Sequence, residues 1–243
     1  MSSAVDKPLP APGTVLKELQ KRFAFRFRKG LSQHFLIEPH TLERIAAASG
    51  AGPGDWIVEV GAGAGFLTAR LLRTGAHVLA IEVDPGMTEL LRTVIGFAPR
   101  LTILEDDLLR VEASRLLAER GAVRWVVVGN LPYHITSPAL FRLLGWGRAG
   151  GPAPARLILM VQREVGARLV AAPGTKAYGR LTVETAYAAN CRKLFEVPPG
   201  AFLPRPKVHS VVLELVPRAP ALPFAAEAVF HRIVRAAFGQ RRK

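Results

Sequence analysis

Short apolar runs alternate with amphipathic segments along most of the 243-residue chain. Runs rich in Val, Ile and Leu predict buried strands, whereas apolar residues that recur every three or four positions predict helices. The predicted strands cover residues 56–60, 77–83, 101–104, 125–128 and 156–161. Because helical patterns separate these strands, the sequence predicts an α/β fold with a mostly parallel, doubly wound sheet.

The last third of the chain departs from this alternation. Two extended apolar runs, 191–197 and 208–216, follow one another, and we expect them to pair as a hairpin-like edge of the sheet. From Pro223 onward the pattern is helical again. We therefore expect three parts: a flexible basic N-terminal arm (1–30), a main α/β domain (31–216) and an abbreviated C-terminal helical domain (217–243).

A glycine-rich turn follows the first predicted strand, at Gly61-Ala62-Gly63-Ala64-Gly65. Such turns either pack a strand on a helix or let the backbone approach a ligand, and Phe66 stands where a GxGxxG dinucleotide motif needs glycine. Glu82, about 20 residues further on, is placed to accept hydrogen bonds from ribose hydroxyls. Asp107 follows the third strand. Since parallel strands end at one edge of the sheet, we expect a ligand site there.

The fourth strand leads into Asn130-Leu131-Pro132-Tyr133. Asn130 offers a carbonyl acceptor and an amide donor, Pro132 fixes its own φ and favours an extended Leu131, and the Tyr133 ring suits stacking. This combination predicts a pocket for a planar molecule that carries an amino group.

Charge and cysteine content narrow the classes of function. The chain has 33 Lys and Arg against 19 Asp and Glu, a net charge of +14, which favours a polyanionic partner. Nucleic acid is favoured over an anionic membrane, because no apolar run approaches the ~20 residues of a membrane span and no signal peptide is evident. We expect a cytoplasmic protein. The single cysteine, Cys191, and the absence of metal-ligand spacing among the six histidines argue against a metal site.

Several motifs, in this order, resemble the S-adenosylmethionine-dependent rRNA adenine dimethyltransferase family. They are Gln33-His34-Phe35-Leu36, Glu59 to Gly65, Glu82-Val83-Asp84, Asp107, Asn130 to Tyr133, Gln162 to Val165, Lys176 to Leu181 and Phe202 to Val208. The resemblance covers nearly the whole chain from Leu31. The Ala-Tyr-Gly-Arg-Leu segment at 177–181 is similar to the branch that dimethylates two adjacent adenines near the 3′ end of small-subunit rRNA.

The resemblance implies a Rossmann-like class I methyltransferase with S-adenosylmethionine as cofactor and no metal. It implies that Asn130, Leu131, Pro132 and Tyr133 carry the chemistry, with Tyr133 stacked on the target base. Phe202 is the candidate for the opposite face of the base, and a core aromatic is an equally good interpretation of it. The implied cofactor-binding residues are Gln33, His34, Leu36, Gly61, Gly63, Glu82, Asp107 and Asn130. The implied partner is small-subunit rRNA within a pre-ribosomal particle, and nothing requires more than a monomer.

The sequence departs from the family pattern at Ser32, Ala62 and Asp106, where glycine, proline and glycine are common, and the C-terminal domain stops earlier than in the family. Three other functions stay open. They are a large-subunit rRNA adenine methyltransferase of the antibiotic-resistance type, a small-subunit assembly factor with little or no methylation, and, less favoured, a nicotinamide-dependent dehydrogenase.

Overall fold

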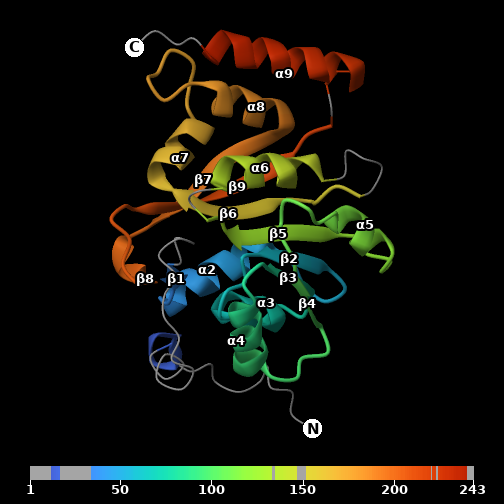
Figure 1. The fold of residues 1–243 in the computed structure, drawn as a ribbon, viewed down its shortest axis with the longest axis vertical. Coiled ribbons are helices and arrows are strands. Elements are labelled where there is room, and N and C mark those ends of the chain that lie inside the picture. The colour runs from blue at the N-terminus through green and yellow to red at the C-terminus, as the bar shows by residue number, and fades with distance from the viewer. Residues whose placement is uncertain are drawn as a thin grey trace.

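A seven-stranded sheet forms the centre of the computed structural model, which describes residues 12–16, 34–132, 135–146, 152–219, 221–222 and 224–239 (Figure 1). Along the sheet, in spatial order, lie β4 (Leu101–Glu105), β3 (His77–Glu82), β2 (Trp56–Val60), β5 (Trp125–Asn130), β6 (Leu157–Gln162), β9 (Ser210–Pro217) and β7 (Ala189–Val197). The first five are mutually parallel, and β9 and β7 are antiparallel to their neighbours. The predicted mostly parallel sheet and its paired edge are confirmed.

Helices cover both faces of this sheet. Successive residues of β5 point to opposite faces: Val126 and Val128 join one core cluster, while Trp125 and Val127 join the other. The first cluster packs against α2 (Pro39–Ser49), α3 (Phe66–Arg73) and α4 (Pro85–Ile95). The second packs against α5 (Ala113–Ala118), α6 (Thr136–Gly145), α7 (Arg163–Leu169) and α8 (Arg180–Ala188).

The C-terminal helix α9 (Phe224–Gly239) lies beside α8 at one end of the molecule (Figure 1). The rings of Tyr187 and Phe230 have centroids 4.4 Å apart, and the Tyr187 hydroxyl donates to Glu227 Oε1 at 2.8 Å. An aromatic contact and a partly buried hydrogen bond therefore attach this helix to the main domain.

A second, two-stranded pair joins distant parts of the chain. In this β1–β8 pair, β1 (Phe35–Leu36) is antiparallel to β8 (Phe202–Leu203), which follows a 3₁₀ turn at Pro199–Ala201. The Ile37 amide donates to the Ala201 carbonyl at 2.8 Å, and His34 Nδ1 lies 2.8 Å from the Pro204 carbonyl. The pair holds the residues that precede α2 against a segment near the C-terminus.

Two local features differ from the sequence expectation. Residues 12–16, inside the predicted flexible arm, form a helical turn whose Leu16 is fully buried in the core, because an apolar side chain gains more by burial than a tail gains by disorder. The rest of the arm lies outside the described residues. Helix α5 was not predicted, since its six residues are too few to show a period. Among the described residues, no helix is long and apolar enough to cross a membrane.

Candidate active site

The glycine turn between β2 and α3 adopts a backbone that only glycine readily tolerates. Gly61, Gly63 and Gly65 have φ of 68°, 53° and 83°, in the left-handed region where a Cβ is strained. A Cβ on Gly65 would also lie 2.5 Å from Leu91 Cδ1 of α4. All three glycines therefore serve the turn, and Gly65 also lets α4 pack closely against it.

Glu82, at the end of β3, holds this turn in place. Its Oε2 accepts from the Gly63 amide at 2.9 Å, and its Oε1 accepts from the amides of Val83 and Asp84 at 2.9 and 3.0 Å. Burial raises the pKa of Glu82, and the three amide hydrogen bonds oppose that rise. A carboxylate can accept about four hydrogen bonds, so Glu82 keeps acceptor capacity for a ligand hydroxyl.

Glu59, in β2, is a site residue that sequence analysis did not select. It is 1% exposed, lines the same cavity as Glu82 and accepts a 2.6 Å hydrogen bond from Thr68 Oγ1. Burial raises the pKa of Glu59 to about 8, and the neighbouring charge of Glu82 adds to the rise. Its signal in the sequence is an acidic residue inside an otherwise apolar strand, which should have marked it as a buried functional carboxyl.

Asp107 follows β4 in a tight turn and also lines the cavity. Its carbonyl accepts from the amides of Arg110 and Val111 at 2.8 and 3.2 Å, and its Oδ1 accepts from the Leu109 amide at 2.9 Å. The amide of Asp106 donates to the Glu82 carbonyl at 3.1 Å, which places this turn beside the end of β3. The two acidic positions predicted at neighbouring strand ends therefore lie at one site.

Asn130 is the last residue of β5, next to β2 in the sheet. The Asn130 Nδ2 donates to the His34 carbonyl at 3.5 Å. The Asn130 main chain passes close to the glycine turn, since a Cβ built on Gly61 would lie 3.6 Å from the Asn130 main-chain oxygen. Leu131 is buried, and its amide donates to the Met160 carbonyl at 3.0 Å. β2 and β5 are the neighbouring strands from which the chain winds in opposite directions, the position where open α/β sheets bind ligands.

One cavity gathers these groups. Of the residues predicted to form the site, it is lined by His34, Leu36, Gly61, Gly63, Glu82, Asp107, Asn130, Leu131 and Pro132. Its other walls are largely apolar, and Glu59 and Asp106 also line it. Apolar walls with several carboxyls suit a ligand that has a flat ring, hydroxyl groups and positive charge, and S-adenosylmethionine has all three.

Three predicted site residues are not part of this cavity as described. Gln33 and Tyr133 lie outside the described residues. Phe202 is 3% exposed, belongs to the core cluster and is not a lining residue of the cavity. Its position in β8 favours the core interpretation over stacking on a base.

A second hollow is a groove of about 650 Å³, and part of its lining follows the lining of the first cavity in the sequence. Ile135 lines the first cavity, whereas Ser137 and Pro138, at the start of α6, line the groove. The other lining residues come from α6, α7, α8 and the loop between them: Phe141, Arg168, Lys176, Ala177, Gly179, Arg180, Leu181 and Glu184. Three cations beside apolar and aromatic side chains suit a nucleic acid.

The sheet order, the glycine turn after β2, the acid that ends β3 and the amide that ends β5 together define a Rossmann-like class I methyltransferase. Comparison with known proteins agrees. The family model described as ribosomal RNA adenine dimethylase matches residues 24–243.

Individual relatives agree with the family match. The Ribosomal RNA small subunit methyltransferase A of Geobacter sulfurreducens is 42% identical over 219 residues, which are 90% of this chain and 78% of that protein. A crystal structure of a dimethyladenosine transferase from Plasmodium falciparum superposes with a TM-score of 0.68 at 27% identity, covering 86% of this chain and 72% of that one. The 23S rRNA methyltransferase ErmE superposes with a TM-score of 0.65 at 28% identity, covering 85% and 79%. The chain therefore belongs to the ribosomal RNA adenine dimethylase family of S-adenosylmethionine-dependent methyltransferases.

Proposed function

We propose that this protein dimethylates the exocyclic amine of two adjacent adenines near the 3′ end of small-subunit rRNA, in a pre-ribosomal particle and as a monomer. The observation that carries the chemistry is the meeting of Asn130 with Glu82 and Asp107 at one cavity. The observation that supports the small subunit is the 42% identity to a relative named for it. The superposition on ErmE is nearly as good as that on the dimethyladenosine transferase, so the fold does not separate the two substrates.

The residues of the cavity have distinct roles in the proposed reaction. Glu82 accepts hydrogen bonds from the ribose of the cofactor, and Asp107 accepts from its adenine amine. When bound, S-adenosylmethionine supplies a methyl group already activated by a sulfonium, so the protein needs no covalent nucleophile. The cavity walls exclude water and align the cofactor with the target.

Asn130 and Leu131 act on the target amine. The lone pair of an adenine amine is delocalised into the ring, so the amine is a poor nucleophile. The Asn130 side-chain carbonyl and the Leu131 main-chain carbonyl accept its two hydrogens and favour a pyramidal nitrogen. After the first transfer only one hydrogen remains, so both hydrogen bonds cannot persist during the second. The target adenine must leave its neighbours to reach these groups, and we propose that the Tyr133 ring stacks on it.

The basic groove supports the nucleic-acid substrate. Arg168 and Arg180 are about half exposed and carry ion pairs with Glu164 and Glu184 on their own helices, at spacings of four residues. The Arg168–Glu164 pair is exposed on both sides and therefore weak, so the Arg168 guanidinium can exchange its carboxylate for a phosphate at low cost. The Glu184 side chain is only 4% exposed, so Arg180 keeps this ion pair and offers its remaining N–H groups to a phosphate. Ile135 lines the cavity and Ser137 lines the groove, so the two sites share one short stretch of chain, and we expect RNA bound in the groove to approach the cavity.

Labelled S-adenosylmethionine supplied with small-subunit and large-subunit particles tests the proposal. We expect label on two adjacent adenines of small-subunit rRNA. Label in large-subunit rRNA alone would overturn the choice of substrate, and label in neither particle would favour an assembly factor. An Asn130→Ala variant separates chemistry from binding: methyl transfer should be lost while cofactor affinity stays near that of wild type. A variant that still methylates at the wild-type rate would remove Asn130 from the mechanism.

A further inference from the structure

Helix α6 is attached to the catalytic segment at its first turn. Thr136 Oγ1 donates to the Pro132 carbonyl at 3.0 Å, and the Ile135 amide donates to the same oxygen at 3.2 Å. Pro132 and Ile135 both line the cavity. The start of the helix therefore fixes the end of the Asn130 segment.

The other end of α6 holds the loop 106–112, which carries Asp107. Arg142 Nη2 lies 2.8 Å from the Val111 carbonyl, 3.3 Å from the Arg110 carbonyl and 2.6 Å from Glu112 Oε1. Trp146 Nε1 donates to the same Val111 carbonyl at 3.1 Å. Arg142 and Trp146 are four residues apart, so both lie on one face of the helical end.

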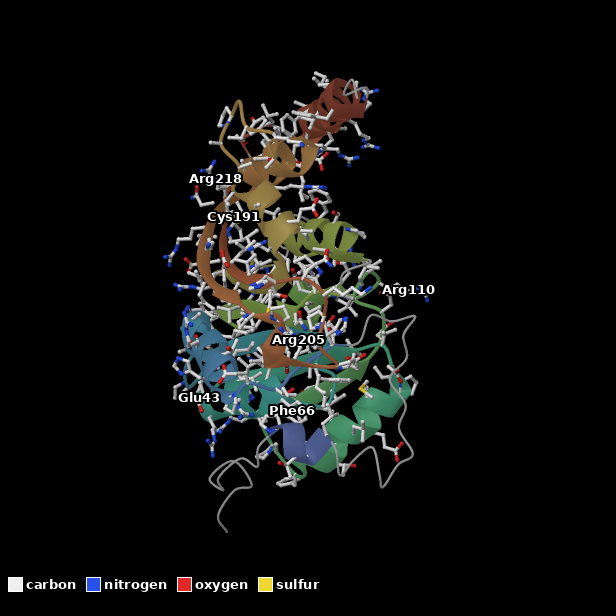
Figure 2. The ribbon with its side chains drawn as sticks, turned by 90° about the vertical axis from the view of Figure 1, so that its left-hand side faces the viewer. Glu43, Phe66, Arg110, Cys191, Arg205 and Arg218 are labelled. Carbon is white, nitrogen blue, oxygen red and sulfur yellow. The ribbon has the colours of Figure 1, made fainter. Side chains whose placement is uncertain are left out.

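Three of these four contacts act on the main chain of the loop, and the fourth is the ion pair of Arg142 with Glu112. The side chain of Arg110 extends into solvent, so only its carbonyl takes part (Figure 2). The Val111 and Trp146 side chains are 4% and 3% exposed, so the hydrogen bond between them is protected from water. Because the Val111 amide also donates to the Asp107 carbonyl, the position of Val111 is passed on to Asp107.

We propose that Arg142 and Trp146 are positioning residues for the adenine ring of the cofactor. They hold Val111, and through it Asp107, at the distance from the cavity that the adenine amine needs. The inference rests on the proposed function, in which Asp107 receives that amine. It adds that α6 links the two halves of the site: its first turn fixes the groups that act on the target base, and its last turn fixes the group that reads the cofactor base.

The test compares wild type and variants in their affinity for two ligands, one with and one without the adenine amine. Trp146→Phe removes the Nε1 donor and keeps a ring against Trp125, whose centroid lies 5.9 Å from that of Trp146; Arg142→Met removes the guanidinium. For each variant we would measure, by calorimetry, the Kd of S-adenosylhomocysteine and of its analogue with hydrogen in place of the adenine amine. Arg115→Met is the matched control, since the side chain of Arg115 is 82% exposed and pairs with Glu119, four residues further along the chain.

We expect each variant to raise the Kd of S-adenosylhomocysteine by about threefold to tenfold, the range for loss of one hydrogen bond. Affinity for the analogue should stay at the wild-type value, because the analogue lacks the group that Asp107 reads. The KM for S-adenosylmethionine should rise while kcat at saturation stays within about twofold. The Arg115→Met control should match wild type for both ligands.

Two results would overturn the inference alone. One is an equal rise in the Kd of both ligands, which would mean that Arg142 and Trp146 stabilise the fold without positioning Asp107. The other is a wild-type preference for the amine kept in both variants. A wild-type protein that binds both ligands equally would instead overturn the role of Asp107 in the proposed function, and the inference with it.

Discussion

Replacing Glu59 with glutamine removes a proton that the folded protein holds and the unfolded chain releases. Burial raises the pKa of Glu59 from its ordinary 4.5 to about 8. Between these two values the unfolded chain binds fewer protons than the folded one, so rising pH favours unfolding. Stability is therefore highest below pH 4.5 as far as this group is concerned, and it is lost as pH rises toward 8.

The size of the effect follows from the pKa difference. The loss is at most about 1.4 kcal/mol for each pH unit between the two pKa values, so from pH 5 to pH 7.5 it amounts to about 3 kcal/mol. Glutamine at position 59 does not titrate and still offers an oxygen to Thr68 Oγ1. The free energy of unfolding of wild type minus that of Glu59→Gln should therefore fall by about 3 kcal/mol over this range.

Urea unfolding followed by circular dichroism at half-unit pH steps measures this difference. Glu82, whose pKa burial also raises, is present in both proteins, so its contribution largely cancels. Glu119→Gln is the control, because the Glu119 side chain is 56% exposed and pairs only weakly with Arg115. A Glu59→Gln difference that stays constant with pH, or grows in favour of wild type, would mean that Glu59 is ionised in the folded protein.

Three further outcomes are expected. Calorimetry should show S-adenosylmethionine binding more tightly as pH rises from 7 to 9, with proton release, because a cation in the cavity lowers the pKa of Glu59; pH-independent affinity would contradict this. Gly129→Ala should lower the free energy of unfolding by about 1–3 kcal/mol in urea titrations, since its Cβ would lie 2.8 Å from the Val60 carbonyl, whereas Gly145→Ala, in open space, should not. The triple variant Arg168→Gln, Lys176→Gln and Arg180→Gln should bind a 3′-terminal small-subunit rRNA fragment more weakly in fluorescence polarisation. The slope of the logarithm of its affinity against the logarithm of salt concentration should fall by about 2. Its affinity for the cofactor should not change.

The parallel part of the fold could be predicted because its strands are continuous apolar runs, such as 125–128, separated by helical periods. Strand ends were less accurate: β5 continues to Asn130, since sheet pairing with β6 extends beyond the apolar residues. The β1–β8 pair could not be predicted, because two-residue strands have no pattern and their partners are far apart in sequence. The N-cap of α2 also lies outside any apolar pattern: both Glu38 side-chain oxygens accept amides of the first turn.

The candidate site was predictable to the extent that its groups end strands. Glu82, Asp107 and Asn130 follow from the rule that parallel strands deliver their carboxyl ends to one edge. Glu59 carries a signal, an acidic residue inside an apolar strand, but strand alternation alone does not tell that its face of β2 borders a cavity. The burial of Phe202 in the core cluster could be seen only in three dimensions, because its two-residue strand has no pattern in the sequence.

The β1–β8 pair sets an order of events during synthesis. The glycine turn, Glu82, Asp107 and Asn130 are all encoded before residue 131, and their strands can pair as soon as that part of the chain is free. The His34 to Leu36 wall waits for residues 202–204, which leave the ribosome roughly 10–30 s after it at about 5–20 residues per second. We therefore expect a nascent chain to pair its five parallel strands, which end at Gln162, before the β1–β8 pair completes the cofactor cavity.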